Sequence, residues 1–270
     1  MTTHAIDQPQ TLTTPSLSTR RSLFVYATYC ETIKLLRTPG FVIPSLLFPS
    51  LLFLMFGLPN LNSHVQGVGA GAYIMVSFGG YITMLIGLMV FSTGLASERA
   101  QGWARLLKAT PLDTFVYFGS KFLPSLFMGL LSLLLLFLVA CLTAHIILAP
   151  GTWLLLSIVL LLGTIPFILL GFGIGSLASP SVAPAVANII YMPLSFASGL
   201  LIPLPSLPGF VQTLAPYLPG YQIGQLGHML IGVSGGGSIW PDILWLVGYT
   251  LLFAVFALYA YRVDQVRNYV

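Results

Sequence analysis

The stretch SERAQGWARLLKATPLDTFVYFGSK, from Ser97 to Lys121, decides the fold. It is the only internal segment that carries charge between two long charge-free tracts. Upstream, residues 38–97 contain no Lys, Arg, Asp or Glu, and downstream residues 122–241 contain none either. This pattern is typical of a membrane protein with one substantial polar loop. The two tracts hold the membrane segments, and the quoted stretch joins them.

The composition of the chain gives the same result. Hydrophobic residues make up 57% of the sequence and charged residues only 6%, with a mean hydropathy of +0.95. These values exclude a soluble domain. In hydrocarbon every backbone N–H and C=O must be paired internally, which leaves helix bundles and closed barrels. The apolar runs are about 20 residues or longer and do not alternate with a period of two, so they predict an all-α membrane protein.

Within the quoted stretch, Glu98 to Lys108 is predicted to form a helix. Ser97 can cap its start, and Glu98 suits the positive N-terminal end of a helix. Pro111 ends it. Its apolar face carries Trp103, Leu106 and Leu107, and its charged face carries Glu98, Gln101 and Arg105. Such an amphipathic helix can lie on the bilayer or dock on a partner.

Six apolar segments are predicted to cross the membrane. Their approximate bounds are 41–58, 70–96, 122–146, 153–178, 185–201 and 243–261. Before them, residues 1–18 are polar and predict a disordered cytoplasmic tail. Residues 19–37 show apolar positions near helical spacing and predict an interfacial helix on the inner leaflet, or alternatively an ordinary helix packed on the bundle. Residues 19–270 are predicted to form a single transmembrane domain.

The segment from Leu200 to Pro241 differs from the rest, because prolines interleave with apolar and aromatic residues. Its two apolar stretches, around Leu207–Leu214 and Tyr221–Ile231, are each too short to span a bilayer. They predict short re-entrant or interfacial helices on the outer side. A disordered linker is the alternative interpretation.

The distribution of positive charge predicts the orientation. With six spans and both termini on one side, all ten Lys and Arg residues fall on that side. They are Arg20, Arg21, Lys34, Arg37, Arg99, Arg105, Lys108, Lys121, Arg262 and Arg267. By the positive-inside rule that side is the cytoplasm, so both termini of this inner or plasma membrane protein are predicted to be cytoplasmic. The net charge of +4 therefore indicates orientation and not nucleic-acid binding.

Several motifs are absent from the sequence. No G-x-x-x-x-G-K-[ST] motif occurs, so the chain is not predicted to hydrolyse ATP itself. Ionisable residues inside membrane spans mark ion-coupling sites and intramembrane catalysts, and the predicted spans lack them except for His145 near a span end. The sequence disfavours an ion-coupled transporter and an intramembrane hydrolase. The His and Cys residues show no metal-ligand spacing, and His64 and His228 fall in predicted loops.

Three sets of residues resemble the membrane subunit of ABC transporters of the ABC-2 type, the class of daunorubicin-resistance-like drug, lipid and glycan exporters. Those near the first span are Arg37, Pro39, Pro49, Phe56 and Gly57. Those in the charged loop are Glu98, Arg99, Gly102, Leu106, Leu107, Thr110 and Pro111. Those before the last span are Ser198, Gly199, Pro203, Leu207, Pro208, Pro216, Pro219 and Tyr221. The three sets occur in the family's order and cover nearly the whole chain.

The resemblance implies a role for two of these segments. The charged helix after span two would be the coupling helix that rests on a cytoplasmic ATPase, with Glu98, Arg99, Gln101, Gly102, Arg105 and Lys108 as its coupling residues. The short segments before the last span would be outer re-entrant helices, marked by Ser198, Gly199, Pro203, Pro208, Pro216, Pro219 and Tyr221. The chain departs from the family at Ala100, where many members have an acidic residue, and at Trp103, where many have Thr. The alternative role for Glu98 is a solvated charge that serves orientation only.

The sequence as a whole predicts a permease subunit of an ATP-driven exporter. Two separate ATPase chains, which carry ATP and Mg, and a second permease copy or homologous permease are the partners that the resemblance implies. No cofactor or metal is expected in this chain. The substrate would be hydrophobic or amphipathic, and Tyr73, Tyr81 and Tyr191 could line its pathway. The rival readings are a membrane-embedded lipid-modifying enzyme, for which no convergent catalytic groups are visible, and an assembly or sensory protein without transport.

Overall fold

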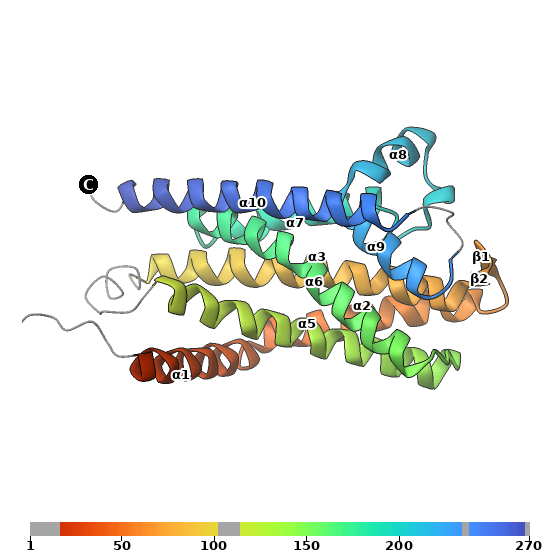
Figure 1. The fold of residues 1–270 in the computed structure, drawn as a ribbon, viewed down its shortest axis with the longest axis horizontal. Helices are drawn as coiled ribbons and strands as arrows, with labels where there is room; N and C mark the ends of the chain where they lie inside the picture. The colour runs from red at the N-terminus through yellow and green to blue at the C-terminus, as the bar shows by residue number, and fades with distance from the viewer. Residues whose placement is uncertain (1–16, 102–113, 234–237, 268–270) are drawn as a thin grey trace, which may run out of the picture.

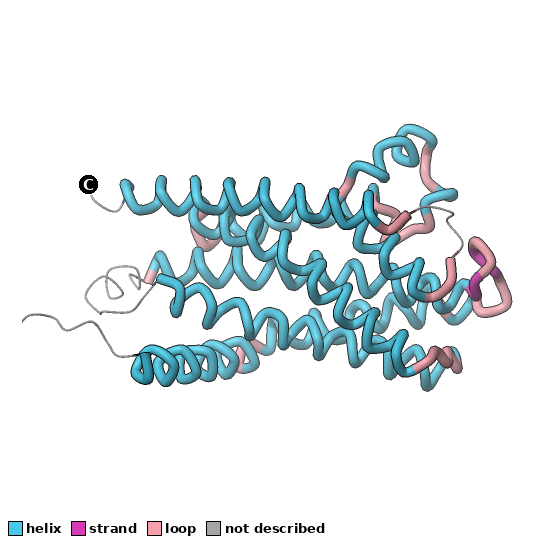
Figure 2. Tube along the Cα trace, in the orientation of Figure 1, coloured by secondary structure: helices cyan, strands magenta, loops and turns pink. Residues whose placement is uncertain are grey.

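The structure, a computed structural model, describes residues 17–101, 114–233 and 238–267. Its larger helices are α1 (Leu17–Leu36), α2 (Pro39–Phe56), α3 (Ala70–Ala100), α5 (Thr114–Ala144), α6 (Pro150–Leu177), α7 (Ala183–Ala197), α9 (Pro219–Leu230) and α10 (Trp240–Arg267). Shorter elements are η1 (Leu58–Asn60), the strands β1 (His64–Val65) and β2 (Val68–Gly69), η2 (Leu204–Ser206), α8 (Gly209–Leu214) and η3 (Ala215–Tyr217). The two strands form one antiparallel hairpin. The described chain is therefore almost entirely helical, as Figure 2 shows.

The long helices lie side by side and the chain passes repeatedly between two ends of the bundle (Figure 1). We call one the charged end, because it holds Glu31, Lys34, Glu98, Arg99, Lys121 and Asp264. We call the other the hairpin end, after β1 and β2. Helices α2, α5 and α7 run toward the hairpin end, and α3, α6 and α10 run back. The C-terminal end of α10 therefore lies at the same end of the bundle as α1.

Helix α3 is the centre of the bundle. In its most apolar part 89% of the residues are buried, against 11% in α10. Helices α6, α5, α7, α9 and α2 all pack against it. The contact with α6 brings backbone against backbone, because a Cβ atom on Gly171 would lie 2.7 Å from the carbonyl oxygen of Leu88. Without a hydrophobic driving force in lipid, such close approach of small residues is what holds helices together.

Within the described residues, five helices are long and apolar enough to cross a membrane, namely α2, α3, α5, α6 and α10. The chain is therefore a multi-pass membrane protein. The segment predicted as a fifth span, 185–201, forms the 15-residue helix α7, which ends at Ala197. Gly199, with φ +73°, follows it in a left-handed conformation that glycine adopts readily, and the chain turns away from the helix.

The structure corrects two helix boundaries. Helix α5 begins at Thr114, before the predicted start of its span at 122, and the end of α3 also differs. The sequence predicts a new helix that starts at Glu98 with Ser97 as its cap, whereas Ser97, Glu98 and Arg99 form the last turn of α3. The Gln101 N–H bonds to the Ser97 carbonyl instead. No Pro interrupts the chain between Ala70 and Ala100, so the helix continues past the apolar tract.

Helix α1 occupies the segment predicted as an interfacial helix. It packs along the first part of α5 and touches α2 only at its end. Its other face exposes Val25, Tyr26 and Tyr29. The helix therefore joins the bundle through one face and leaves an apolar face uncovered.

Candidate functional site: the charged end and the hairpin-end pocket

At the charged end, the Glu98 carboxylate lies buried where α1, α3 and α5 meet, with only 5% of the residue exposed. Lys121 Nζ donates to its Oε1 at 2.6 Å, and Lys34 Nζ donates to the same oxygen. The Tyr117 hydroxyl donates to Oε2 at 2.7 Å. Lys121 also pairs with Glu31 of α1 at 2.7 Å. A single buried carboxylate thus ties three helices together.

The two lysines at Glu98 have different surroundings. The Lys121 side chain is 10% exposed and the Lys34 side chain 55%. Burial disfavours the Lys34 ammonium, but its hydrogen bond and charge attraction to Glu98 prevail and hold the Lys34 pKa above its ordinary value. Lys34 therefore carries its charge at physiological pH.

Arg99 makes a second connection at the charged end. Its Nη2 lies 2.5 Å from the Asp264 carboxylate of α10. Its Nη1 donates to the carbonyl oxygens of Gly175 at 3.1 Å and Ala178 at 3.3 Å, at the C-terminal end of α6. These carbonyls have no partner within the helix. Glu98 and Arg99, adjacent on α3, therefore link the central helix to α1, α5, α6 and α10.

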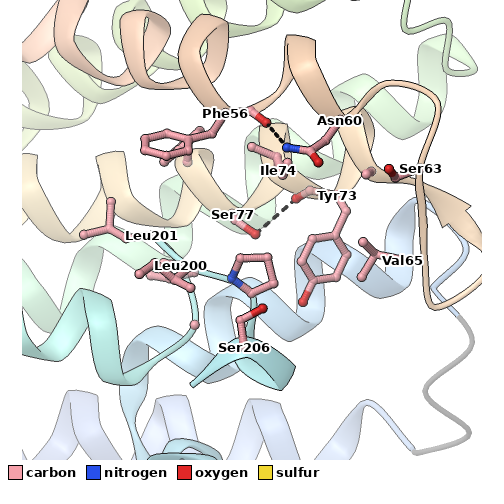
Figure 3. Close-up of a pocket in the computed structure, with 15 residues that line it drawn as sticks. Phe56, Asn60, Ser63, Val65, Tyr73, Ile74, Ser77, Leu200, Leu201 and Ser206 are labelled. Carbon is pink, nitrogen blue, oxygen red and sulfur yellow. Dashed lines mark hydrogen bonds between the residues drawn. The ribbon is translucent and has the colours of Figure 1, made fainter. Parts of the chain in front are cut away.

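At the hairpin end, a cavity of about 410 Å³ opens between α2, α3, the β-hairpin and the segment after α7 (Figure 3). We call it the hairpin-end pocket. Its lining residues are Phe56, Asn60, Ser63, Val65, Ala70, Tyr73, Ile74, Ser77, Phe78, Gly199, Leu200, Leu201, Ile202, Pro203 and Ser206. None of these residues carries a charge. The volume lies in the range of about 300–1,000 Å³ that is typical of ligand sites.

His228 of α9 supports one wall of this pocket from behind. Its ring stacks on Tyr73, with centroids 3.8 Å apart. Its Nε2 lies 3.0 Å from Ser77 Oγ and 3.2 Å from the Tyr73 carbonyl oxygen. Burial lowers the pKa of the imidazole to about 4, although the bond to the Tyr73 carbonyl raises it. The ring is therefore neutral at physiological pH and holds Tyr73 and Ser77 in place.

Comparison with known proteins identifies the family. Residues 58–259 match the model of the ABC-2 family transporter proteins. The chain belongs to the ABC-2 transporter family. A similar curated protein is "Putative transport permease YvfS" of Bacillus subtilis (strain 168), which is 30% identical over 236 residues, 87% of this chain and 95% of the relative. Family membership supports a transporter permease.

In this ABC-2 chain, the residues predicted for ATPase coupling separate into three groups. Glu98 and Arg99 have their side chains engaged inside the chain, whereas the sequence places Glu98 on a face free to meet a partner. Gln101 is exposed at the end of α3. Gly102, Arg105 and Lys108 lie outside the described residues. Sequence reasoning missed Glu31, Lys34, Tyr117 and Asp264 as partners. The sequence offered little indication of these contacts, because charged residues near the end of a span are already expected from the orientation of the chain in the membrane.

The three tyrosines predicted to line a pathway lie in different surroundings. Tyr73 lines the hairpin-end pocket. Tyr81 and Tyr191 are buried, and their hydroxyls bond to each other at 2.9 Å across the contact between α3 and α7. In this conformation the two tyrosines stabilise the interface between α3 and α7.

The proline-rich segment of the ABC-2 chain folds into ordered short elements. Pro203 lines the hairpin-end pocket, Pro208 precedes α8, and Pro219 occupies the first position of α9, where its missing N–H is not needed. Pro216 accepts a hydrogen bond from the Gln222 side chain. Ser198 is buried beside Gly220, and Tyr221 lies in α9. Within the described residues, the disordered-linker alternative is therefore wrong.

The sequence places His228 in a loop but also within the short helix predicted around Tyr221–Ile231, and the structure agrees with the helix. The buried His228 lies in the last turn of the amphipathic helix α9. Its distance to Ser77 Oγ resembles that of a nucleophile and its base, but among the described residues no carboxylate orients the imidazole. The described residues also contain no cluster of three or more His, Cys, Asp or Glu that could hold a metal. The arrangement supports a wall of the hairpin-end pocket.

Proposed function

We propose that this chain is the permease subunit of an ATP-driven exporter that moves a hydrophobic or amphipathic substrate out of the cytoplasm. The observation that carries the proposal is the ABC-2 match over residues 58–259. The sequence lacks a nucleotide-binding motif, so separate ATPase chains supply the energy. In this arrangement the charged end faces the cytoplasm and the hairpin end faces outward.

The contacts at the charged end support a coupling role for the segment after α3. Glu98 and Arg99 lie just before residues 102–113, and their side chains connect α3 with four other helices. An ATPase that pushes on the segment at Gly102, Arg105 and Lys108 would therefore move α1, α5, α6 and α10 together with α3. In this mechanism Arg105 meets the partner, whereas Glu98 and Arg99 transmit the displacement inside the chain.

We further propose that α7 is a sixth crossing. The chain before it is held at the charged end, where Ala178 bonds to Arg99, and the chain after it lines the hairpin-end pocket through Leu200. Its 15 residues span only about 22 Å, so the residues after Ala197 complete the crossing of a hydrocarbon core of about 30 Å. This gives the six spans and cytoplasmic termini that the sequence predicts.

A second permease copy or a homologous permease is part of the proposed complex. Leu244, Leu251, Val255 and Leu258 form an exposed apolar stripe on α10, each at least 60% exposed. Such a stripe must be covered by lipid or by another subunit. Two ATPase chains, one for each permease, complete the assembly.

Charge reversal at Arg105 tests the proposed coupling. The chain is purified with its co-expressed ATPase, and bound ATPase and ATP hydrolysis in lipid are measured for the wild type, Arg105→Glu and Arg262→Glu. Arg262 is the matched control, because it is an exposed arginine at the same end of the molecule. We expect Arg105→Glu to reduce ATPase binding about tenfold or more, as for a charge at an interface, and Arg262→Glu to change it little. Equal binding by both variants and the wild type would exclude this docking site.

A further inference from the structure

The hairpin-end pocket has a polar mouth. Asn60, Ser63 and Ser206 are exposed and line it near the end of the bundle, and the buried Tyr73 of α3 lies next to them. The described residues offer no hydrogen-bond partner to the hydroxyls of Ser63, Tyr73 and Ser206. Asn60 donates its Nδ2 to the Phe56 carbonyl at 2.9 Å, which leaves its Oδ1 to accept. Figure 3 shows the hydroxyl end of Tyr73 directed into the space bordered by Ser206 and Val65.

The floor of the pocket is apolar. Phe78 and Leu200 are 1% and 2% exposed, and Ile74 lies between Tyr73 and Phe78 along α3. From Ala70 to Phe78 the helix rises about 12 Å, which is the depth over which α3 lines the pocket. Ser77 also reaches the floor, but its hydroxyl is occupied by the Tyr73 carbonyl at 3.1 Å and by His228.

These features define the kind of ligand that the pocket can hold. An anionic or cationic head would find no opposite charge among the lining residues, and burying an unpaired charge is strongly unfavourable. A hydroxyl group would find several free donors and acceptors at the mouth. A purely apolar molecule would leave these groups unused. A short alkyl chain would be covered by the floor.

We propose that the hairpin-end pocket binds an uncharged single-chain amphiphile, with its hydroxyl-bearing end at the mouth and its alkyl chain on the floor. Tyr73 contacts the hydroxyl, and Phe78 and Leu200 contact the chain. His228 is a positioning residue that holds the Tyr73 ring by stacking. Binding at this pocket requires neither ATP nor a partner chain.

Photolabelling tests the proposal on the purified full-length chain in lipid bilayers. The two probes are the monoglyceride of a diazirine-bearing decanoic acid and the free acid, which has the same chain and is used at an alkaline pH that keeps its head ionised at the bilayer surface. We expect saturable labelling of residues 56–78 and 199–206 by the monoglyceride, at least about tenfold stronger than labelling by the acid. Absent or non-saturable labelling, or equal labelling by both probes, would overturn the proposal.

Variants locate the site. Ile202→Trp fills the pocket, and Ile239→Trp is the control, since Ile239 is exposed at the same end but does not line the pocket. We expect the first variant to lose labelling and the second to keep it. Tyr73→Phe keeps the stacking ring and should weaken monoglyceride binding roughly two- to twelvefold, as for one lost hydrogen bond. Unchanged binding in both Ile202→Trp and Tyr73→Phe would show that the ligand sits elsewhere. Because no ATPase is present, failure of this test leaves the proposed transport function untouched.

Discussion

Lys121 and Lys34 donate hydrogen bonds to the same Glu98 oxygen, but their side chains differ in exposure to solvent. Lys121 is nearly buried, whereas half of the Lys34 side chain remains in solvent. Removing the buried lysine leaves the Glu98 carboxylate with only the half-exposed Lys34 and the Tyr117 hydroxyl, and loss of a buried partner costs about 3–5 kcal/mol. An exposed pair contributes about 0–1 kcal/mol. The same carboxylate should therefore respond very differently to the loss of each lysine.

We expect Lys121→Met to lower the free energy of unfolding by about 3–5 kcal/mol and Lys34→Met by about 1 kcal/mol or less. Denaturant titration of both variants in the same detergent measures the difference. In the double variant Glu98→Gln and Lys121→Met much of the loss should be recovered, since position 98 no longer carries a charge and Glu31 keeps Lys34 as its partner. Similar losses for the two single variants would contradict the role assigned to burial at Glu98.

At the scale of elements, the packing of α6 on α3 depends on glycines that leave no room for a side chain. A Cβ atom on Gly171 would lie 2.7 Å and 2.8 Å from the carbonyl oxygens of Leu88 and Gly87. Gly94, also on α3, has open space around its own Cβ position. The surroundings of the two glycines therefore predict opposite effects of a substitution by alanine on stability.

We expect Gly171→Ala to destabilise the protein by about 1–3 kcal/mol, because the helices must separate to admit the methyl group. Gly94→Ala should stabilise it by up to about 1 kcal/mol, because alanine loses less backbone entropy in a helix. Thermal unfolding in detergent compares the two variants with the wild type. A loss of stability in Gly94→Ala as large as in Gly171→Ala would argue against the close contact.

The elements show what could be predicted from the sequence and what could not. Apolar runs and prolines located most helices to within a few residues, because length and composition govern insertion into lipid. The predicted end of α3 was wrong, because the partners of Glu98 come from α1 and α5, and local capping rules do not include such distant partners. The role of His228 was missed for the same reason: Tyr73 and Ser77 are about 150 residues away along the chain. Long-range polar contacts have no periodic signal in a single sequence.

For the whole molecule, the two ends of the bundle should differ in accessibility from outside the cell. In a chain with Cys30 and Cys141 replaced, a cysteine at His64 should react with an impermeant thiol reagent in sealed cells, because β1 lies at the hairpin end. A cysteine at Gln101 should not react, because the end of α3 is cytoplasmic in the proposed orientation. Lysed cells are the control, in which both positions should be labelled. Labelling of position 101 in sealed cells would reverse the orientation.

The central position of α3 also has a consequence for how the protein is made. This helix leaves the ribosome early, but α6, which packs on it at Gly87, is complete only 77 residues later. At about 5–20 residues per second, synthesis of that interval takes roughly 4–15 s. During that time α2 and α5 can already pack on α3, but the surface around Gly87, which contacts Phe167 and Ile168 of α6, lacks its partner. In a nascent chain that stalls after α5, the α3 surface around Gly87 stays without α6. We expect cellular quality control to recognise an unfinished permease by this exposed surface.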